Sequence, residues 1–384
     1  NVSYSQMKLK KKFLYFLFLA SLLGKRIIPW SETILDLELP EIKKQEDLRL
    51  LVLFDNSFSC PEGCLPFVSP LLPSWVQWDV TDFKNISELQ SIISQNIQPK
   101  FGPPHVLIAA RMPTLTWMGD WSKAFRFNFP TKSVGLLHMA DEKNLDGLEI
   151  PPNSYTYILR NYYFASIKNL PSDVTLSTLG AYSCGTQKDL VESKTRKDFY
   201  GLYWTFLPPL VGPSHRHPLS MWPSSGREFD CVFVGSLRAD RKEMLNELQL
   251  RKDTLNCVTS IERKYKGTKG EYVYIHKFLS KSKFSLVPHG NSPETHRLAE
   301  SLLTGTIPVT VQADYLSQVF IPFPGLVGTN WTDAFSQMND VLVASIVNAT
   351  ILNELQTSCS EWYSRYLKCQ QKDFDGLLLK IMST

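Results

Sequence analysis

Outside residues 1–26, the sequence lacks a large excess of charge of either sign. Residues 1–26 contain six of the 41 basic side chains and none of the 37 acidic ones. The rest of the 384-residue chain therefore has 35 basic and 37 acidic side chains, a net charge of −2. A nearly neutral body offers no extended basic surface, so we expect no nucleic-acid partner.

The sequence also lacks the run of about 20 apolar residues that usually crosses a membrane. Its apolar segment Phe13–Gly24 is shorter, follows a lysine cluster and is closed by Lys25 and Arg26. With no convincing small-x-small cleavage site, this pattern favours a signal-anchor over the alternative, a cleaved signal peptide. We therefore expect a single-pass type II protein of the Golgi or ER membrane with a lumenal body. The sequons that suit glycosylation of such a body begin at Asn85, Asn330 and Asn348.

Cysteine is sparse, with seven residues in the chain. No second CxxC and no paired histidines accompany Cys60 and Cys64, which argues against a zinc site. In an oxidising compartment, Cys60–Cys64 and Cys359–Cys369 are candidate pairs, although spacing alone does not fix the connectivity. We expect no bound metal.

The chain does have the composition of a globular protein, with 43% hydrophobic and 20% charged residues, and a length that suits two domains. Short apolar runs between turn residues indicate buried strands of parallel sheets, alternating with helices. The expected strands are 48–54, 105–110, 133–138, 155–160, 230–234, 257–261, 284–288 and 307–311. The expected helices are 87–97, 240–248, 271–280 and 292–304, with a last helical region in 333–380.

These elements predict an α/β protein with two Rossmann-like domains. The expected divisions are a cytosolic tail and anchor (1–26), a stem (27–45), a first domain (46–206), a proline-rich linker (207–228), a second domain (229–335) and a C-terminal helical region (336–384). The last region is long enough to cross back over the first domain.

The most informative stretch is Phe284–Pro308, which has the pattern strand, turn, helix, turn, strand. His289 and Gly290 follow the first strand at its carboxyl end, where open α/β sheets bind ligands. Ser292 suits a helix N-cap and Pro293 a first helical position. Because a helix N-terminus attracts phosphate, this turn is a candidate phosphate site.

Arg297 and Glu300 lie three residues apart on the face of this helix opposite Leu298 and Leu302. A guanidinium suits a diphosphate, and a carboxylate suits the two hydroxyls of a ribose. The alternative is an ordinary surface ion pair between the two side chains.

The same stretch resembles the signature of the exostosin-type glycosyltransferases, F-x-L-x-P-x-G followed by S-P, R-x-x-E and small-x-G-x-I-P-V. The matching residues are Phe284, Leu286, Pro288, Gly290, Ser292, Pro293, Arg297, Glu300, Gly305, Ile307, Pro308 and Val309. His289 stands where the family often has arginine, and Thr306 where it often has cysteine. Weaker similarities lie in 135–143, 159–164 and 232–241.

The resemblance implies a GT-B fold, in which two Rossmann-like domains with parallel sheets face a cleft and a C-terminal helix crosses back. It implies transfer of a sugar from a nucleotide-sugar, expected to be a UDP-sugar, to a hydroxyl of a glycan or glycoprotein acceptor, with inversion. The partners expected are this donor, the acceptor and the membrane, with a homo- or heterodimer as an option. The one clear D-x-D, Asp373–Asp375, lies in the helical tail, so we expect arginines and a helix N-terminus to replace a metal, and no cofactor to be required.

Specific residues follow from this arrangement. The expected nucleotide-sugar ligands are Arg238, Arg241, His289, Gly290, Ser292, Arg297 and Glu300. For the base that takes the acceptor proton we predict Asp141, followed by His138 and Glu142, all at the end of the third strand. The alternative is a packed histidine and a helix-capping aspartate. Arg160 is expected on the acceptor side, or in an interdomain ion pair.

Two other functions remain open. A GDP-fucose-dependent fucosyltransferase shares the basic and acidic helix pair, but a Y-x-T-E-K helix start is expected there and this chain has Glu294-Thr295-His296-Arg297. A catalytically inactive accessory subunit with the same fold is the second alternative.

Overall fold

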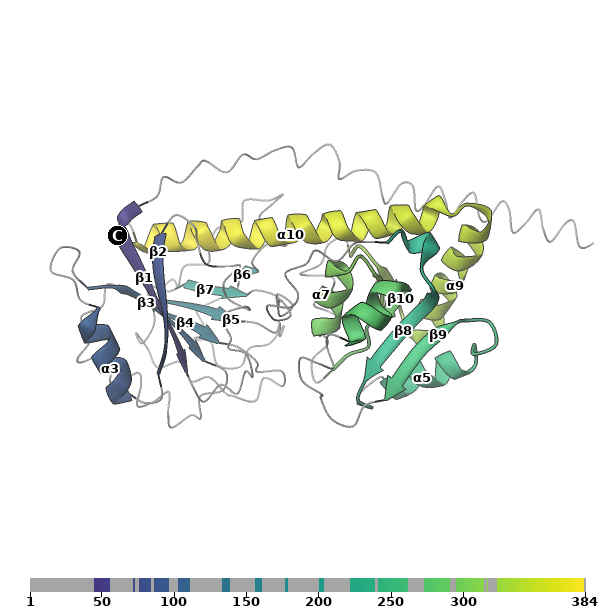
Figure 1. Cartoon of the computed structure of the whole chain (residues 1–384), viewed down its shortest axis with the longest axis horizontal. Helices are drawn as coiled ribbons and strands as arrows, with labels where there is room; N and C mark the ends of the chain where they lie inside the picture. Colours follow the sequence, from purple (N-terminus) through teal and green to yellow (C-terminus); the bar gives the residue numbers. More distant parts are fainter. Residues whose placement is uncertain are drawn as a thin grey trace, which may run out of the picture.

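The computed structural model describes two groups of strands and the helices around them (Figure 1). The described residues are 45–55, 72, 76–83, 86–96, 103–110, 133–138, 156–160, 177–178, 200–203, 222–238, 241–261, 273–290, 295–313, 316 and 323–382. Both sheets are parallel throughout the described strand pairs, as the continuous apolar runs predicted.

The first sheet has the strand order β2-β1-β3-β4-β5-β7-β6. Its elements are β1 (Gln45–Asp55), β2 (Val76–Phe83), α3 (Ile86–Gln95), β3 (His105–Ala110), β4 (Ser133–His138), β5 (Tyr157–Arg160), β6 (Ser177–Thr178) and β7 (Tyr200–Tyr203). The central strands are buried along their length because their residues are apolar at successive positions. Val52, Leu107, Ile108 and Leu137 are fully buried.

The second sheet has the strand order β12-β11-β10-β8-β9. Its strands are β8 (Phe229–Gly235), β9 (Cys257–Ile261), β10 (Ser282–Leu286), β11 (Ile307–Val311) and β12 (Leu326–Gly328). The helices are η3 (Ser224–Gly226), α5 (Arg241–Gln249), η4 (Tyr274–Phe278), η5 (Leu279–Lys281), α7 (His296–Leu303), α9 (Trp331–Val347) and α10 (Thr350–Met382).

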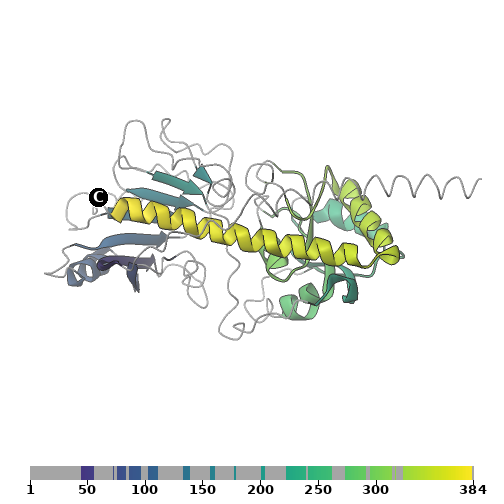
Figure 2. The same cartoon turned by 90° about the horizontal axis from the view of Figure 1, so that it is seen from above.

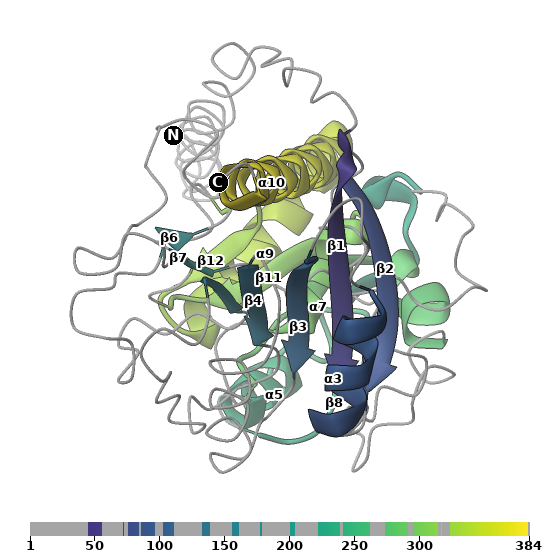
Figure 3. The ribbon, with the colours of Figure 1, turned by 90° about the vertical axis from the view of Figure 1, so that its left-hand side faces the viewer.

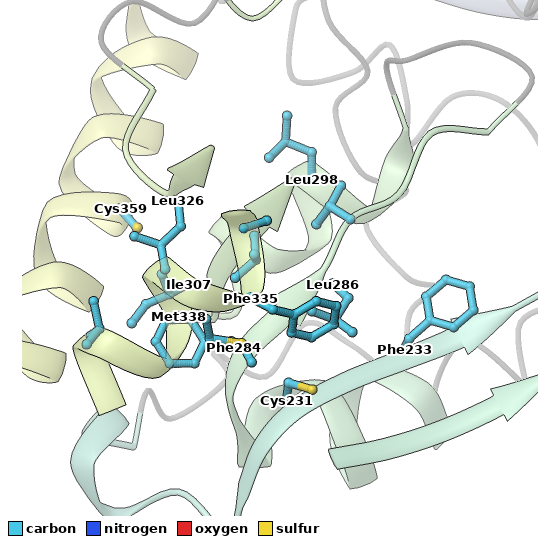
Figure 4. Close-up of a cluster of buried hydrophobic side chains, with 14 of the residues drawn as sticks. Cys231, Phe233, Phe284, Leu286, Leu298, Ile307, Leu326, Phe335, Met338 and Cys359 are labelled. Carbon is cyan, nitrogen blue, oxygen red and sulfur yellow. The ribbon is translucent and has the colours of Figure 1, made fainter. Parts of the chain in front are cut away.

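The hydrophobic core around the second sheet is centred on Phe284 and Leu286 of β10, with Ile307, Phe335 and Met338 beside them (Figure 4). Phe284, Leu286 and Ile307 are fully buried. Figure 4 also shows Phe233, one strand away on β8, lying at the rim of this cluster. Its side chain is fully buried and belongs to the same cluster.

Helix α10 connects the two halves of the molecule. Its 33 residues span about 50 Å, and Figures 1 and 2 show it running from the second sheet over the first. Figure 3 shows α10 from its C-terminal end, running above the strands of the first sheet. Phe374, Leu377 and Leu378 are fully buried near that end. The predicted α/β fold of two parallel sheets with a C-terminal helix crossing back is thus confirmed.

Arg227, in the segment just before β8, is a buried cation that is only 4% exposed. Its guanidinium donates hydrogen bonds to the carbonyl oxygens of Trp222 (3.2 Å), Ser282 (2.9 Å) and Thr304 (2.9 Å) and to Thr306 Oγ1 (2.8 Å). Burial lowers the pKa of Arg227 to about 10, so the group stays charged at neutral pH. Arg227 therefore joins the segment before β8 to β10 and to the loop between α7 and β11.

The cysteines pair differently from the expectation. Cys231 and Cys257, which are register partners on β8 and β9, form a disulfide. Cys359 is free and buried, and its Sγ donates to the carbonyl oxygen of Pro324. Cys359 and Cys369 both lie in α10, about 15 Å apart along its axis, which is too far for a disulfide. The candidate pair Cys60–Cys64 lies outside the described residues.

The expected location in a Golgi or ER membrane is corrected by the structure. From Gln45 onward, none of the described helices is both long and apolar enough to cross a membrane. The segment that was expected to be the anchor, residues 1–26, lies outside the described residues.

Two of the three sequon asparagines have capping roles. Asn330 is the N-cap of α9, and its side-chain oxygen accepts a hydrogen bond from the Asp333 amide at 2.9 Å. Asn348 follows α9, and its side-chain oxygen accepts from the amide (3.1 Å) and hydroxyl (2.9 Å) of Thr350. Both asparagines are exposed, and Asn85 lies outside the described residues.

Candidate functional site

The carboxyl ends of β8 and β10 and the first turn of α7 form the candidate site. β8 and β10 are parallel neighbours, with Phe284 opposite Cys231, so their carboxyl ends lie at the same edge of the sheet. α7 begins later than predicted: its N-cap is Thr295, with an extended backbone (φ −132°, ψ 149°), and Ser292 lies outside the described residues. Threonine also suits an N-cap, so the helix pattern itself did not decide between the two positions.

Two arginines contact the ring of Phe233 at this edge. The Cζ of Arg241 lies 5.9 Å and that of Arg297 5.1 Å from the ring centroid. Such cation–π contacts hold each guanidinium against an apolar surface. Both cations are thereby concentrated at the place where the helix dipole of α7 also attracts an anion.

Arg241 links the two loops that border the site. It is 7% exposed and donates from Nε to the carbonyl oxygen of His289 at 3.1 Å. Its Nη1 donates to the carbonyl oxygen (2.8 Å) and to the hydroxyl (3.2 Å) of Ser236. The loop after β8 and the loop after β10 are therefore fixed to each other by one side chain.

Arg297 reaches back from α7 to β8. Its Nη2 donates to the carbonyl oxygen of Val234, and the guanidinium covers Gly235. Glu300, only 8% exposed, is buried on the same helix. In the described structure, Arg297 is therefore bonded to the backbone of β8.

Gly235→Ala tests the position of Arg297. A Cβ at Gly235 would overlap the Nη2 of Arg297, and the far end of that side chain would have to move off Val234. Because a flexible side chain can yield, we expect stability to fall by only about 1 kcal/mol or less, while affinity for a nucleoside diphosphate falls about tenfold. Calorimetric titration measures the affinity. Gly226→Ala, with no atom within 4 Å of its added Cβ, is the matched control and should bind as the parent does.

Several buried polar atoms at this site have no hydrogen-bond partner among the described residues. These atoms are Tyr274 Oη, Ser285 Oγ, His289 Nε2, Thr295 Oγ1 and Arg297 Nε. Buried polar groups in proteins are nearly always hydrogen bonded, and each exception costs about 1–3 kcal/mol. Donors and acceptors left together in this way are suited to a polar ligand.

The remaining predicted ligands fall around this edge or outside the described part of the chain. Arg238 is exposed three residues after the end of β8, and Gly290 lies in the loop after β10. Within the described ranges, no group of three or more metal-ligating side chains stands close enough to hold an ion.

The predicted catalytic side of the site is described in part. His138 and Arg160 are the last residues of β4 and β5 and are register partners, so their backbones lie side by side at the carboxyl end of the first sheet. Asp141 and Glu142 lie outside the described residues.

Sequence reasoning did not find Phe233, Gly235 or Tyr274. The aromatic residue two positions before the glycine in VFVG is a local signal that was available for Phe233 and Gly235. Tyr274 falls in a predicted α-helix, 271–280, that the structure replaces with a π-helix followed by a 3-10 turn.

No protein-family model matches the chain, and no curated protein sequence matches it. Among solved structures, the N-terminal domain of Candida albicans trehalose-6-phosphate phosphatase is similar with a TM-score of 0.46 at 8% identity, over 87% of this chain and 97% of that one. A mutant of Thermobaculum terrenum O-GlcNAc transferase gives 0.44 at 12% identity, over 89% and 69%. An α1,3-fucosyltransferase gives 0.37 at 15% identity, over 79% and 80%. These similarities are too distant to assign a reaction.

Proposed function

We propose that the protein is a glycosyltransferase that transfers a sugar from a UDP-sugar to a hydroxyl of a glycan or glycoprotein, with inversion. The observation that carries the proposal is the pair of arginines on Phe233, placed beside unpartnered buried polar atoms at the carboxyl ends of β8 and β10. Positive charge and hydrogen-bonding groups at this edge of a parallel sheet suit a nucleoside diphosphate. The exostosin-type signature in Phe284–Pro308 supports the same function.

The proposed reaction assigns a role to each side of the molecule. The acceptor oxygen forms a bond to C1 of the sugar while the bond from C1 to the diphosphate oxygen breaks, and the diphosphate leaves with the electron pair. Asp141, with His138 and Glu142 as the next candidates, takes the acceptor proton, and Arg160 binds on the acceptor side. Arg238, Arg241, Arg297 and the start of α7 stabilise the charge that develops on the leaving diphosphate. With these cations in place, we propose that neither a metal nor another cofactor is required.

The remaining proposed ligands follow the same geometry. His289, Gly290 and Ser292 would contact the phosphates from the loop between β10 and α7, and Glu300 would accept from the ribose. We also propose the domain division 46–206, 229–335 and 336–384, with the acceptor on the first domain and the donor on the second. Figure 1 is consistent with that division, since the second sheet and its helices form one of the two groups.

A thermal-shift titration tests the proposal. UDP at about 100 times its dissociation constant should stabilise the purified protein by about 2.7 kcal/mol, which corresponds to a melting shift of about 5–10 °C, and EDTA should leave the shift unchanged. Uridine is the matched control and should stabilise much less, because it has no phosphate for the arginines. A shift with GDP alone would replace the UDP-sugar by a GDP-sugar such as the fucose donor. No shift with either nucleotide would contradict donor binding and favour an inactive accessory subunit.

A further inference from the structure

A covalent cross-link joins the strand that carries the candidate site to its neighbour. The disulfide connects Cys231 of β8 with Cys257 of β9, which are register partners on adjacent parallel strands. Cys231 is fully buried in the core around the second sheet, whereas Cys257 is half-buried. Among the described strands of this sheet, β9 stands at the edge. A reductant therefore reaches the disulfide from the edge of the sheet, on the Cys257 side.

The residues that hold the two site arginines follow Cys231 closely along the chain. The Phe233 ring contacts both guanidiniums, the carbonyl oxygen of Val234 accepts a hydrogen bond from one, and Ser236 accepts from the other. All of these contacts lie within five residues of Cys231. The pairing with β9 continues to the last residue of β8. The position of β9 therefore bears directly on the backbone that holds the arginines.

β9 packs mainly against β8. None of its five residues is buried, so the strand contributes little burial of apolar surface of its own. An edge strand also forms its ladder on one side alone. The backbone hydrogen bonds to β8 and the disulfide therefore do most to keep β9 in place. Removal of the cross-link should loosen the two strands where they approach the arginines.

We propose that the Cys231–Cys257 disulfide is a redox-sensitive positioning cross-link, which keeps β8 in the form that binds a nucleoside diphosphate and weakens this binding when it is reduced. The inference rests on the proposed function, in which Arg241 and Arg297 bind the diphosphate. The reductant is a low-molecular-weight thiol of the glutathione class. Its thiolate attacks the Sγ of Cys257, and the Sγ of Cys231 leaves with the electron pair and takes a proton. A second thiol then releases Cys257 as a thiol and forms the disulfide of the reductant.

Calorimetric titration of the purified full-length protein before and after reduction measures the effect on affinity. The reduced protein should bind UDP about tenfold more weakly at a temperature where circular dichroism shows it folded, and reoxidation should restore the affinity. The double variant Cys231→Ala/Cys257→Ala should bind as the reduced parent does and no longer respond to the reductant. Cys359→Ala removes a buried free thiol outside the pair, so it is the matched control and should respond as the parent does.

Thermodynamic linkage gives a second test that needs no variant. If the oxidised form binds UDP about tenfold more tightly, saturating UDP must favour the disulfide by the same factor. In glutathione buffers, the midpoint potential of the pair should therefore become about 30 mV more negative. Alkylation and mass spectrometry of the peptides that contain Cys231 and Cys257 follow this pair separately from the other cysteines. The same concentration of uridine, which has no phosphate, should move the midpoint much less.

The outcomes separate this inference from the proposed function. An unmoved midpoint, or a reduced parent with unchanged UDP affinity, would overturn the inference and leave the proposed function standing. Unfolding of the parent on reduction would also overturn it, because the cross-link would then serve stability alone. A response that persists in the double variant would assign the effect to other cysteines. Absence of UDP binding by both the oxidised and the reduced parent would remove the proposed function, and the inference with it.

Discussion

Replacing Arg241 with methionine is expected to weaken UDP binding about 100-fold while the protein stays folded. The guanidinium binds the backbone of both site loops at once, at Ser236 and His289, and brings positive charge to the proposed diphosphate position. Loss of hydrogen bonds to a charged group and of the cation together corresponds to about 3 kcal/mol of binding free energy. Methionine keeps an apolar contact with Phe233, so the core should remain packed.

The matched control for this variant is Arg251→Met. Arg251 also places its Cζ over an aromatic ring, at 5.3 Å from the centroid of Phe335, but it pairs with Glu247 on α5 rather than with the site loops. Calorimetric titration should therefore give an unchanged UDP affinity for this control. Equal losses in the two variants would mean that the arginines act only through stability, and unchanged binding in Arg241→Met would remove Arg241 from the donor site.

Replacing Arg227 with methionine is expected to lower the free energy of unfolding by about 3 kcal/mol or more. The substitution leaves the carbonyl oxygens of Ser282 and Thr304 buried without their donor, and each such group costs about 1–3 kcal/mol. For a domain of this size, the loss corresponds to a fall in melting temperature of about 6–12 °C. Circular dichroism during heating measures it.

Two further variants serve to interpret the loss of stability expected for Arg227→Met. Arg227→Lys keeps the charge but cannot supply the planar fork of donors, so we expect it to recover only part of the lost stability. Arg365→Met removes a half-exposed cation that pairs at 3.6 Å with Glu361 on the surface of α10, and its cost should stay within about 0.5 kcal/mol. A melting temperature for Arg227→Met equal to that of Arg365→Met would contradict the role given to the buried guanidinium.

The sequence predicted strands of both sheets well where buried strands have continuous apolar residues. The expected strands 257–261 and 307–311 coincide with β9 and β11, and 105–110 and 133–138 coincide with β3 and β4. In these runs apolar residues stand at successive positions and do not alternate with polar ones, so they indicate strands covered on both faces. β2 was missed because its residues, VQWDVTDF, alternate polar and apolar and have no continuous apolar run. It is an edge strand of the first sheet.

The candidate site was predictable only as a set of residue types. The spacing of Arg297 and Glu300 placed both on one helix face, but it did not show that this face of α7 is covered by other parts of the domain. The bond from Arg297 to Val234 joins residues 63 positions apart, and the disulfide Cys231–Cys257 depends on the register of β8 and β9. Such long-range contacts are set by packing, for which a single sequence carries no local signal.

The central claim is that the carboxyl ends of β8 and β10 and the start of α7 bind a nucleoside diphosphate. Hydrogen–deuterium exchange of the purified protein, with and without saturating UDP, tests this claim directly because it reports where binding protects the backbone. The account predicts added protection in peptides that cover residues 232–241 and 284–300, with the Arg241→Met variant showing little at the same UDP concentration. Protection confined to other segments, or none at a concentration that stabilises the protein, would contradict the account.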